Sequence, residues 1–311
     1  MDYLYFLQNL REGSMSWLTP VLYCISEYGV TLAFLIPLVI YWCIDKKAGK
    51  KIVFAYSFSL VFNDFVKNIA CVYRPWIKDE RLHHYSKAGK TATGYSFPSG
   101  HTVGASSSYF GIGLWQKNRK AVAAIFFILP FFVAFARNWL GAHTLQDVCV
   151  GLAEGFLAAF FMSKVIEYFD DDKKDVILLC ASLLVVAVFY VVVMLKSYPI
   201  DYLVDGSIAA DPAKMKLDFI KMAGMFSGFV IAWFLERRFV KFDVPESVPA
   251  KIIVGSIGVG TAGLFLYVLV PFIFSKAGAE VKGFARYFIT MIWTVCLYPL
   301  VFSSIVKKIK K

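Results

Sequence analysis

The chain has 311 residues, of which 59% are hydrophobic and only 18% are charged. Soluble proteins usually have about 45–50% apolar and about 25% charged residues, so this composition excludes a disordered chain and an ordinary soluble enzyme. The net charge of +11 does not indicate nucleic-acid binding, because membrane proteins collect Lys and Arg in their cytoplasmic loops. We therefore expect a protein that crosses a membrane many times.

Nine apolar stretches follow one another along the chain and predict an all-α polytopic membrane bundle of about nine spans. They cover residues 16–44, 52–72, 99–115, 121–137, 145–168, 176–195, 219–234, 252–274 and 284–306. The first is long enough to hold a surface helix followed by a span, and Pro20, Glu27 and Gly29 favour that division. Apolar positions within residues 3–10 predict a short amphipathic helix on the membrane surface.

Basic residues in alternate loops predict the orientation of the chain. They lie within residues 46–51, 117–120, 173–174, 237–241 and 307–311. The positive-inside rule makes these loops cytoplasmic, which places the N-terminus and residues 74–97 and 138–144 outside. The outer segment 74–97 is also basic and breaks the rule, so we expect its cations to attract anionic headgroups. These cations are Lys78, Arg81, Lys87 and Lys90.

Two cations precede Pro75 at the end of the second apolar stretch. Lys67 and Arg74 are seven residues apart, which predicts that they share one face of a helix that Pro75 ends. Such a pair is well placed to hold a dianion. The alternative is that each side chain extends to the membrane interface.

A second motif, Pro-Ser-Gly-His, occupies residues 98–101. Pro98 and Ser99 predict the start of a helix, whose free N–H groups and positive dipole end suit a phosphate. Gly100 lets a ligand approach the backbone. His101 would lie in the first turn, where it can exchange a proton.

A third motif contains Arg137, His143 and Asp147, with Gly141 predicting the end of a helix before the histidine. The i, i+4 spacing places His143 and Asp147 on one helix face. A carboxylate bonded to one ring nitrogen fixes the tautomer and leaves the other as a nucleophile, although a capping His–Asp pair is an alternative. Three cations, two histidines and a carboxylate on one side of the membrane suit phosphoryl transfer.

The three motifs in this order, K-x6-RP, PSGH and R-x5-H-x3-D, resemble those of the type 2 phosphatidic acid phosphatase (PAP2) superfamily of membrane lipid phosphatases. The resemblance covers roughly residues 50–168. It implies that His143 attacks phosphorus, that Asp147 orients His143, and that His101 protonates the leaving group. The residues implied to bind the phosphate are Lys67, Arg74, Ser99, Gly100 and Arg137.

The resemblance also implies a reaction without a metal or other cofactor, because cations and amides stabilise the phosphoryl oxygens. The six cysteines have no CxxC or CxxH spacing and predict no zinc or haem site. Two departures from the family pattern stand out. Ala136 replaces the serine that usually precedes the arginine of the third motif, and the first of the family's six spans has no counterpart here.

We expect two domains: residues 1–168 as a PAP2-like catalytic membrane core with an N-terminal surface helix, and residues 169–311 as a transmembrane extension of about four spans. Asp64 lies one turn before Lys67, and we expect it to be a partner that tunes this lysine and not a catalyst. Glu27 and Glu154 lie within apolar stretches, where hydrogen bonds between packed helices are the simplest explanation.

The sequence thus predicts an integral protein of the cell or inner membrane that hydrolyses a lipid phosphate or diphosphate on the extracytoplasmic face. Isoprenoid diphosphate, phosphatidylglycerol phosphate and phosphatidate all fit the motifs. Its partners would be the phosphorylated lipid and membrane lipids, with no nucleic acid. One alternative is a phosphotransferase that passes the phosphate from His143 to an acceptor. Another is a lipid or ion transporter with a vestigial site, for which Glu27, Asp64 and Glu154 would be suited.

Overall fold

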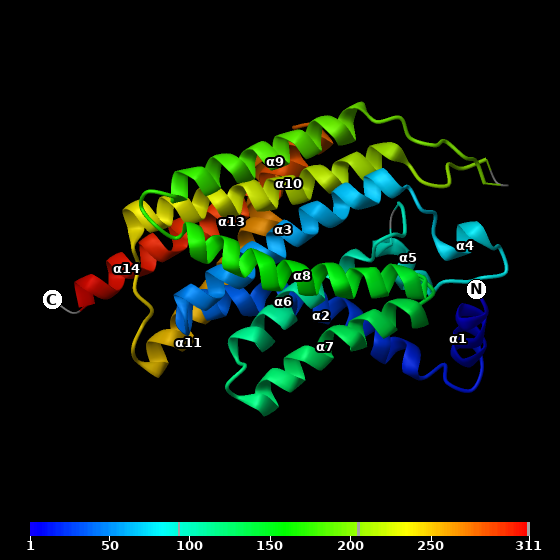
Figure 1. Ribbon diagram of the computed structural model, residues 1–311, viewed down its shortest axis with the longest axis horizontal. Coiled ribbons are helices and arrows are strands. Elements are labelled where there is room, and N and C mark those ends of the chain that lie inside the picture. Colours follow the sequence, from blue (N-terminus) through cyan, green and yellow to red (C-terminus); the bar gives the residue numbers. More distant parts are fainter. Residues whose placement is uncertain (93, 204–205, 310–311) are drawn as a thin grey trace.

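The computed structural model describes residues 1–92, 94–203 and 206–309, and every regular element in these ranges is helical. The long helices run along one common direction and form an elongated bundle (Figure 1). The predicted all-α class is therefore confirmed.

The part of the chain that carries the three motifs forms eight helices. They are α1 (Asp2–Glu12), α2 (Leu18–Cys43), α3 (Lys46–Ala70), α4 (Pro75–Lys78), α5 (Ser86–Thr91), α6 (Gly100–Trp115), α7 (Lys120–Trp139) and α8 (Leu145–Phe169). The remainder forms further helices, some interrupted by the π-helical turns η1 to η3. They are α9 (Asp175–Leu195), α10 (Pro212–Leu235), η1 (Glu236–Val240), α11 (Val248–Leu264), η2 (Phe265–Leu269), α12 (Val270–Ile273), α13 (Ala279–Ile292), η3 (Trp293–Leu297) and α14 (Tyr298–Ile309).

Seven helical segments in the described ranges are long and apolar enough to cross a membrane. They are Leu18–Cys43, Lys120–Trp139, Leu145–Phe169, Asp175–Leu195, Pro212–Val240, Val248–Ile273 and Ala279–Ser303. The other two predicted spans are α3 and α6. Helix α3 carries several charged residues, and α6 has only 16 residues, about 24 Å at 1.5 Å per residue. Both pack inside the bundle against α8.

Helix α2 is continuous from Leu18 to Cys43, so the expected division into a surface helix and a span is wrong. Gly29 instead serves close packing: a Cβ atom there would lie 2.8 Å from Cγ2 of Val133. The Gly29 carbonyl also accepts a hydrogen bond from the hydroxyl of Tyr109 at 2.6 Å. Helix α2 thereby packs closely against α6 and α7.

Helix α1 is the short amphipathic helix that the sequence predicts. It buries Leu4 and Leu7 and leaves Tyr3 and Phe6 exposed. Arg11, at its end, donates hydrogen bonds to the backbone carbonyls of Trp139 and His83, both at 2.7 Å. These bonds attach α1 to the end of the bundle where α4 and α5 lie (Figure 1).

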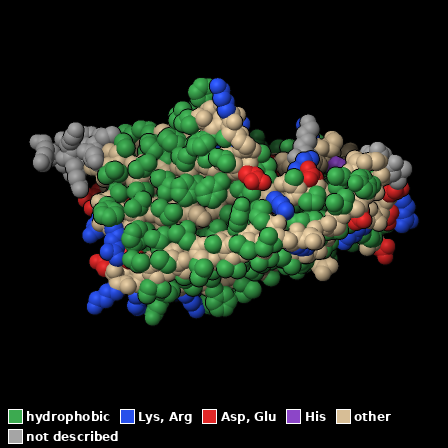
Figure 2. All heavy atoms as spheres, turned by 90° about the horizontal axis from the view of Figure 1, so that it is seen from above, with side chains coloured by type: hydrophobic (Ala, Val, Ile, Leu, Met, Phe, Trp, Pro, Cys, Tyr) green, Lys and Arg blue, Asp and Glu red, His purple; other side chains and the backbone are tan. Residues whose placement is uncertain are grey.

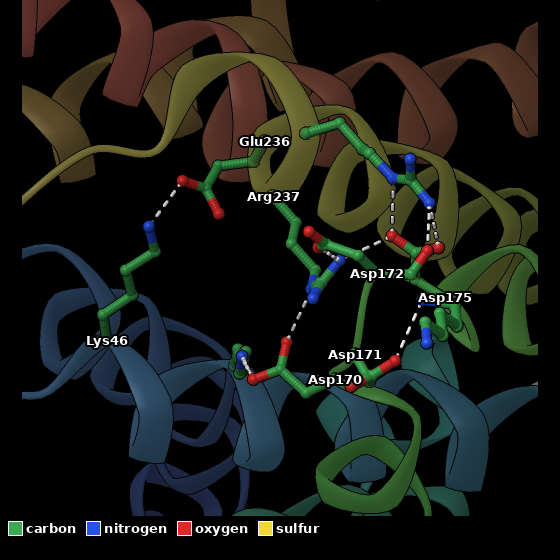
Figure 3. Close-up of polar contacts among 10 residues, drawn as sticks. Lys46, Asp170, Asp171, Asp172, Asp175, Glu236 and Arg237 are labelled. Carbon is green, nitrogen blue, oxygen red and sulfur yellow. Dashed lines mark hydrogen bonds and ion pairs between the residues drawn. The ribbon is translucent and has the colours of Figure 1, made fainter.

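The opposite end is held together by ion pairs between loops that are far apart in sequence (Figure 3). Lys46, at the start of α3, pairs with Glu236 of η1 at 2.6 Å. Arg237 pairs with Asp170 at 3.1 Å and with the fully buried Asp175 at 2.6 Å. Three of the loops predicted to be cytoplasmic thus meet at one end. The side chains of residues 304–311 lie outside the described part.

Hydrophobic side chains cover most of the face shown in Figure 2. Many Lys, Arg, Asp and Glu side chains lie at its left and right ends, and a few lie near its centre. A continuous apolar surface of this extent is typical of a protein surrounded by lipid. Together with the seven candidate spans, it identifies an integral membrane protein.

Candidate active site

The three motifs meet at the end of the bundle away from the ion-pair network. Arg74 lies between α3 and α4, Ser99 is the N-cap of α6, and His143 lies between α7 and α8. Arg74, Ser99 and His143 are almost completely buried. The loops and helix ends therefore form one enclosed polar cluster.

The guanidinium group of Arg74 contacts the imidazole of His143. Arg74 Nη1 lies 2.8 Å from Nε2 of His143 and also donates to the carbonyl of Ala142 at 2.9 Å. Arg74 Nε donates to the carbonyl of Gly94 at 3.1 Å. Because a guanidinium can only donate, Nε2 of His143 is the acceptor and the ring proton is on Nδ1.

The other side of the His143 ring faces Asp147. Nδ1 lies 3.5 Å from Oδ2 of Asp147 and 3.3 Å from the hydroxyl of Ser96. The same Oδ2 accepts hydrogen bonds from the Ser96 hydroxyl at 2.5 Å and from the Thr144 backbone N–H at 2.7 Å. A carboxylate held in this way is a stable acceptor for the Nδ1 proton.

The expectation that His143 and Asp147 occupy one helix face is wrong in detail. Helix α8 begins at Leu145, and Thr144 is its N-cap. Thr144 and Asp147 form a capping box, in which each side chain bonds to the backbone of the other. His143 therefore precedes the helix, and the cap brings Asp147 back toward its ring.

The expectation that Lys67 and Arg74 share a helix face is also wrong, because α3 ends at Ala70. Cys71 has a left-handed backbone conformation with φ of 48°, which turns the chain out of the helix. Lys67 remains in the last turn of α3, 3.5 Å from Asp64 Oδ1, so the predicted contact with Asp64 is present. The two cations therefore approach the site from different elements.

The predicted helix start at the second motif is present. Ser99 is the N-cap of α6, its backbone N–H donates to the carbonyl of Asp147 at 3.1 Å, and its hydroxyl accepts from Thr102 at 3.0 Å. A Cβ atom on Gly100 would lie 3.5 Å from Nζ of Lys67. The N-terminus of α6 thus lies beside a lysine, an arrangement that suits an anion.

Arg137 is fully buried near the end of α7. Its Nη1 donates to the hydroxyl of Ser26 at 3.1 Å and lies 3.5 Å from Oε1 of Glu27. Its Nε and Nη2 have no hydrogen-bond partner among the described residues. Buried donors are almost always satisfied, so these two are available to an anion.

Ala136 leaves the site without the serine expected before Arg137. Ser26 of α2 provides a hydroxyl to the same guanidinium group from another helix. Nothing in the three motifs predicts this contact.

Glu27 is a residue whose position the sequence did not predict. Its Oε1 lies 3.3 Å from Nε2 of His101 and 3.5 Å from Nη1 of Arg137. The only signal in the sequence was a carboxylate within an apolar stretch, which is costly without a partner. The structure places it beside two motif residues, His101 and Arg137.

The charge states of the loop residues suit a nucleophilic histidine. Burial, followed by the charge of Arg74, lowers the pKa of His143 well below its ordinary value. Burial, followed by the charge of Arg137, lowers the pKa of Arg74 to about 9. At neutral pH, His143 is therefore neutral and Arg74 is still a cation.

Two cavities border this cluster and share Phe97. One, of about 550 Å³, lies between α1 and the start of α8 and is lined by Lys78 and Asp147. The other, of about 440 Å³, lies between α3 and α8 and is lined mainly by apolar side chains. Its lining includes Phe58, Phe62, Phe97, Pro98, Leu157 and Phe161.

No group of three or more His, Cys, Asp or Glu in the described part of the chain is arranged to hold a metal ion. The positive charges of the site are supplied by Lys67, Arg74 and Arg137. Positively charged side chains and helix N-termini are groups that stabilise developing charge on phosphoryl oxygens.

Comparison with family models identifies both parts of the chain. The PAP2 superfamily model matches residues 48–171, and the model described as "PAP2 superfamily phosphatase, transmembrane extension" matches residues 220–309. No curated protein and no solved structure matches the chain. The two matched ranges together cover more than half of the chain and include every motif residue described above. The chain therefore belongs to the PAP2 superfamily and carries the transmembrane extension found in phosphatases of that superfamily.

Proposed function

We propose that this membrane phosphatase hydrolyses a lipid phosphate or diphosphate through a phosphohistidine on His143. The observation that carries the proposal is the pair of contacts on the His143 ring. Asp147 and Ser96 lie at Nδ1, while Arg74 donates to Nε2. Nε2 thus has a lone pair for attack, beside a cation able to bind the phosphoryl oxygens.

Binding begins with the exchange of partners at Arg74. A phosphate group that enters the cluster takes hydrogen bonds from Arg74 and from the free Nε and Nη2 of Arg137. Lys67 and the first amides of α6 bind the remaining oxygens. The exchange uncovers Nε2 of His143 when phosphorus is within reach.

In the first step, Nε2 of His143 forms a bond to phosphorus while the bond to the leaving oxygen breaks. The leaving oxygen takes a proton from His101 and departs as an alcohol or as a phosphate. In the second step, His101 takes a proton from a water molecule, whose oxygen attacks phosphorus. The bond to Nε2 then breaks and inorganic phosphate leaves.

The apolar cavity between α3 and α8 supports a lipid substrate. The lining of the cavity between α3 and α8 includes Phe97 and Pro98, which directly precede Ser99 of the second motif. Its apolar lining suits a hydrocarbon chain, which would place a headgroup at the membrane surface close to His143. The orientation predicted from the basic loops places this surface on the extracytoplasmic side.

The test is release of inorganic phosphate by the purified protein in detergent, with EDTA present. The substrates are a long-chain alkyl phosphate, phosphatidate, phosphatidylglycerol phosphate and an isoprenoid diphosphate, and His143→Ala is the blank. We expect release from at least one of them, with acid-labile, base-stable phosphate on the protein during turnover. Equal release by His143→Ala would contradict the proposal. Transfer to an added lipid alcohol in place of water would identify a phosphotransferase.

A further inference from the structure

Glu27 connects the two halves of the phosphate site from a helix that carries none of the three motifs. Its Oε1 lies 3.3 Å from His101 Nε2, 3.5 Å from Arg137 Nη1 and 3.4 Å from the Thr91 hydroxyl. Its side chain is about 27% exposed, whereas Arg137 is fully buried. A single carboxylate oxygen therefore contacts a candidate proton donor and a candidate phosphate ligand.

The need to balance the charge of Arg137 does not by itself explain why Glu27 also contacts His101. Arg137 Nη1 already donates to Ser26 at 3.1 Å, which is closer than its distance to Glu27. His101 is at the first turn of α6, where the helix dipole disfavours an imidazolium. The carboxylate of Glu27 acts against that effect, because a neighbouring negative charge favours the protonated ring.

We propose that Glu27 is the positioning residue for His101, and that it maintains this histidine as the proton donor to the leaving group. This inference rests on the proposed phosphatase function. The Nε2–H of His101 donates to Glu27, so Nδ1 is the nitrogen that carries the transferable proton. When the bond from phosphorus to the leaving oxygen breaks, that oxygen takes the Nδ1 proton. The ring becomes neutral, and Glu27 stays ionised.

The site then contains two carboxylate–histidine pairs with opposite tasks. Asp147 keeps a proton on Nδ1 of His143 and leaves Nε2 free to attack. Glu27 binds Nε2 of His101 and keeps that ring ready to give a proton from Nδ1. Each histidine is oriented by a carboxylate from a different helix, α8 or α2.

The leaving group distinguishes this role from a structural one. An alkoxide must be protonated as it departs, whereas p-nitrophenolate is stable as an anion and needs little help. Loss of the proton donor should therefore slow hydrolysis of an alkyl phosphate far more than hydrolysis of p-nitrophenyl phosphate. Loss of charge balance at Arg137 or of packing should slow both to the same extent.

The variant is Glu27→Gln, which keeps the size of the side chain and removes its charge. We expect kcat/KM to fall about 100-fold on a long-chain alkyl phosphate, within the range of general acid catalysis, but less than about tenfold on p-nitrophenyl phosphate. Glu27→Asp keeps the charge and should fall between the parent and Glu27→Gln on the alkyl substrate. It also provides a test if Glu27→Gln does not fold.

Glu12→Gln is the matched control, because Glu12 also contacts a histidine at 3.3 Å, His83, on the exposed surface. It should leave both rates unchanged. The double variant of Glu27→Gln with His101→Ala should be no slower on the alkyl substrate than His101→Ala alone, because residues that act through each other are not additive.

Equal losses on the two substrates, or no loss on either, would overturn the role of Glu27 while phosphate release by the parent still supports the phosphatase. A parent that releases phosphate from neither substrate, nor from any lipid of the panel, would overturn the proposed function and this inference with it. A loss confined to the alkyl phosphate supports both.

Discussion

Arg74 Nη1 lies 2.8 Å from Nε2 of His143, so the arginine covers the one ring nitrogen that is free to act as a nucleophile. In the proposed mechanism, a phosphate competes for the same guanidinium and uncovers the nitrogen. Substrate binding and activation of the nucleophile would then be one event.

Replacement of Arg74 tests this relationship. Arg74→Lys keeps the positive charge but loses the planar guanidinium group, which can donate two hydrogen bonds to a phosphate. We expect kcat to fall roughly 100-fold, because this cation binds the charge that develops on the phosphoryl oxygens in the transition state. The uncovered His143 should also react faster with diethyl pyrocarbonate in the absence of substrate. Both quantities are measurable on the same preparation, and unchanged reactivity of His143 would contradict the covering role.

The nucleophile itself gives the second prediction. His143→Ala should lower turnover by several orders of magnitude, while the protein still folds. Asp147→Asn should leave a small residual activity, because the tautomer is no longer enforced although the ring remains. Phosphate release assays and size-exclusion profiles measure the two effects. Turnover close to the parental value in His143→Ala would exclude a phosphohistidine on this residue.

The pH dependence follows from the lowered pKa of His143. Only the neutral ring can attack, so activity is lost as the pH falls through the pKa of the free enzyme. The acid limb of kcat/KM should therefore lie below about 6.5, the ordinary histidine value. The substrate phosphate also ionises near pH 6, so its pKa is measured separately and kcat/KM is corrected for the fraction of substrate in each ionic form. In Arg74→Ala the acid limb should move to higher pH, because loss of the neighbouring positive charge raises the pKa of His143.

The outer loop gives a fourth prediction, although its four cations are not equivalent. Lys78 lines the cavity beside Asp147 and Lys87 is exposed, whereas Arg81 is paired with Asp79 at 2.9 Å. The side chain of Lys90 lies outside the described part. Attraction of an anionic headgroup should therefore depend chiefly on Lys78.

Lys78→Ala should raise KM several-fold and leave kcat close to that of the parent, because the lysine acts on capture and not on the chemical step. The effect should shrink as salt increases, since charges are screened over about 8 Å at physiological ionic strength. Arg81→Ala is the control and should change KM less. A loss of kcat at constant KM in Lys78→Ala would assign this lysine to the reaction itself.

Sidedness is the fifth prediction. In a variant without native cysteines, Ser86→Cys on α5 should react with an impermeant thiol reagent from outside intact cells, and Lys47→Cys on α3 should not. Both positions are exposed. The nearby Ala88 and Ala48 are buried, so a cysteine at either position would not react with the reagent from either side. The reverse pattern of labelling would place the candidate site on the cytoplasmic side.

The sequence predicted the helical bundle and the motif residues, because apolar periodicity and fixed spacing are local properties. It predicted helix continuity less well. The left-handed residue Cys71 ends α3 before Arg74, and a cysteine gives no local signal for such a turn. The continuous α2 likewise depends on packing of Gly29 against α7, which spacing along the chain does not reveal.

The contacts that complete the site were not predictable for a different reason. Ser26 and Glu27 lie more than 60 residues before the side chains that they contact in Thr91, His101 and Arg137. Only the packing of α2 against α6 and α7 brings them together. A motif search detects residues at fixed spacing within a segment, so it finds His101 and Arg137 but not the carboxylate between them.

Residues that follow the range matched by the PAP2 model pack against the loops of the site. Met215 of α10 accepts a hydrogen bond through its sulfur from the Tyr95 N–H at 3.3 Å, next to Ser96. Tyr198 donates to Asn68 at 2.7 Å, one residue after Lys67. A protein shortened after residue 168 would keep every motif side chain and lose these supports. We expect such a fragment to be a poor starting point for engineering a minimal enzyme, even though it contains the complete set of reactive groups.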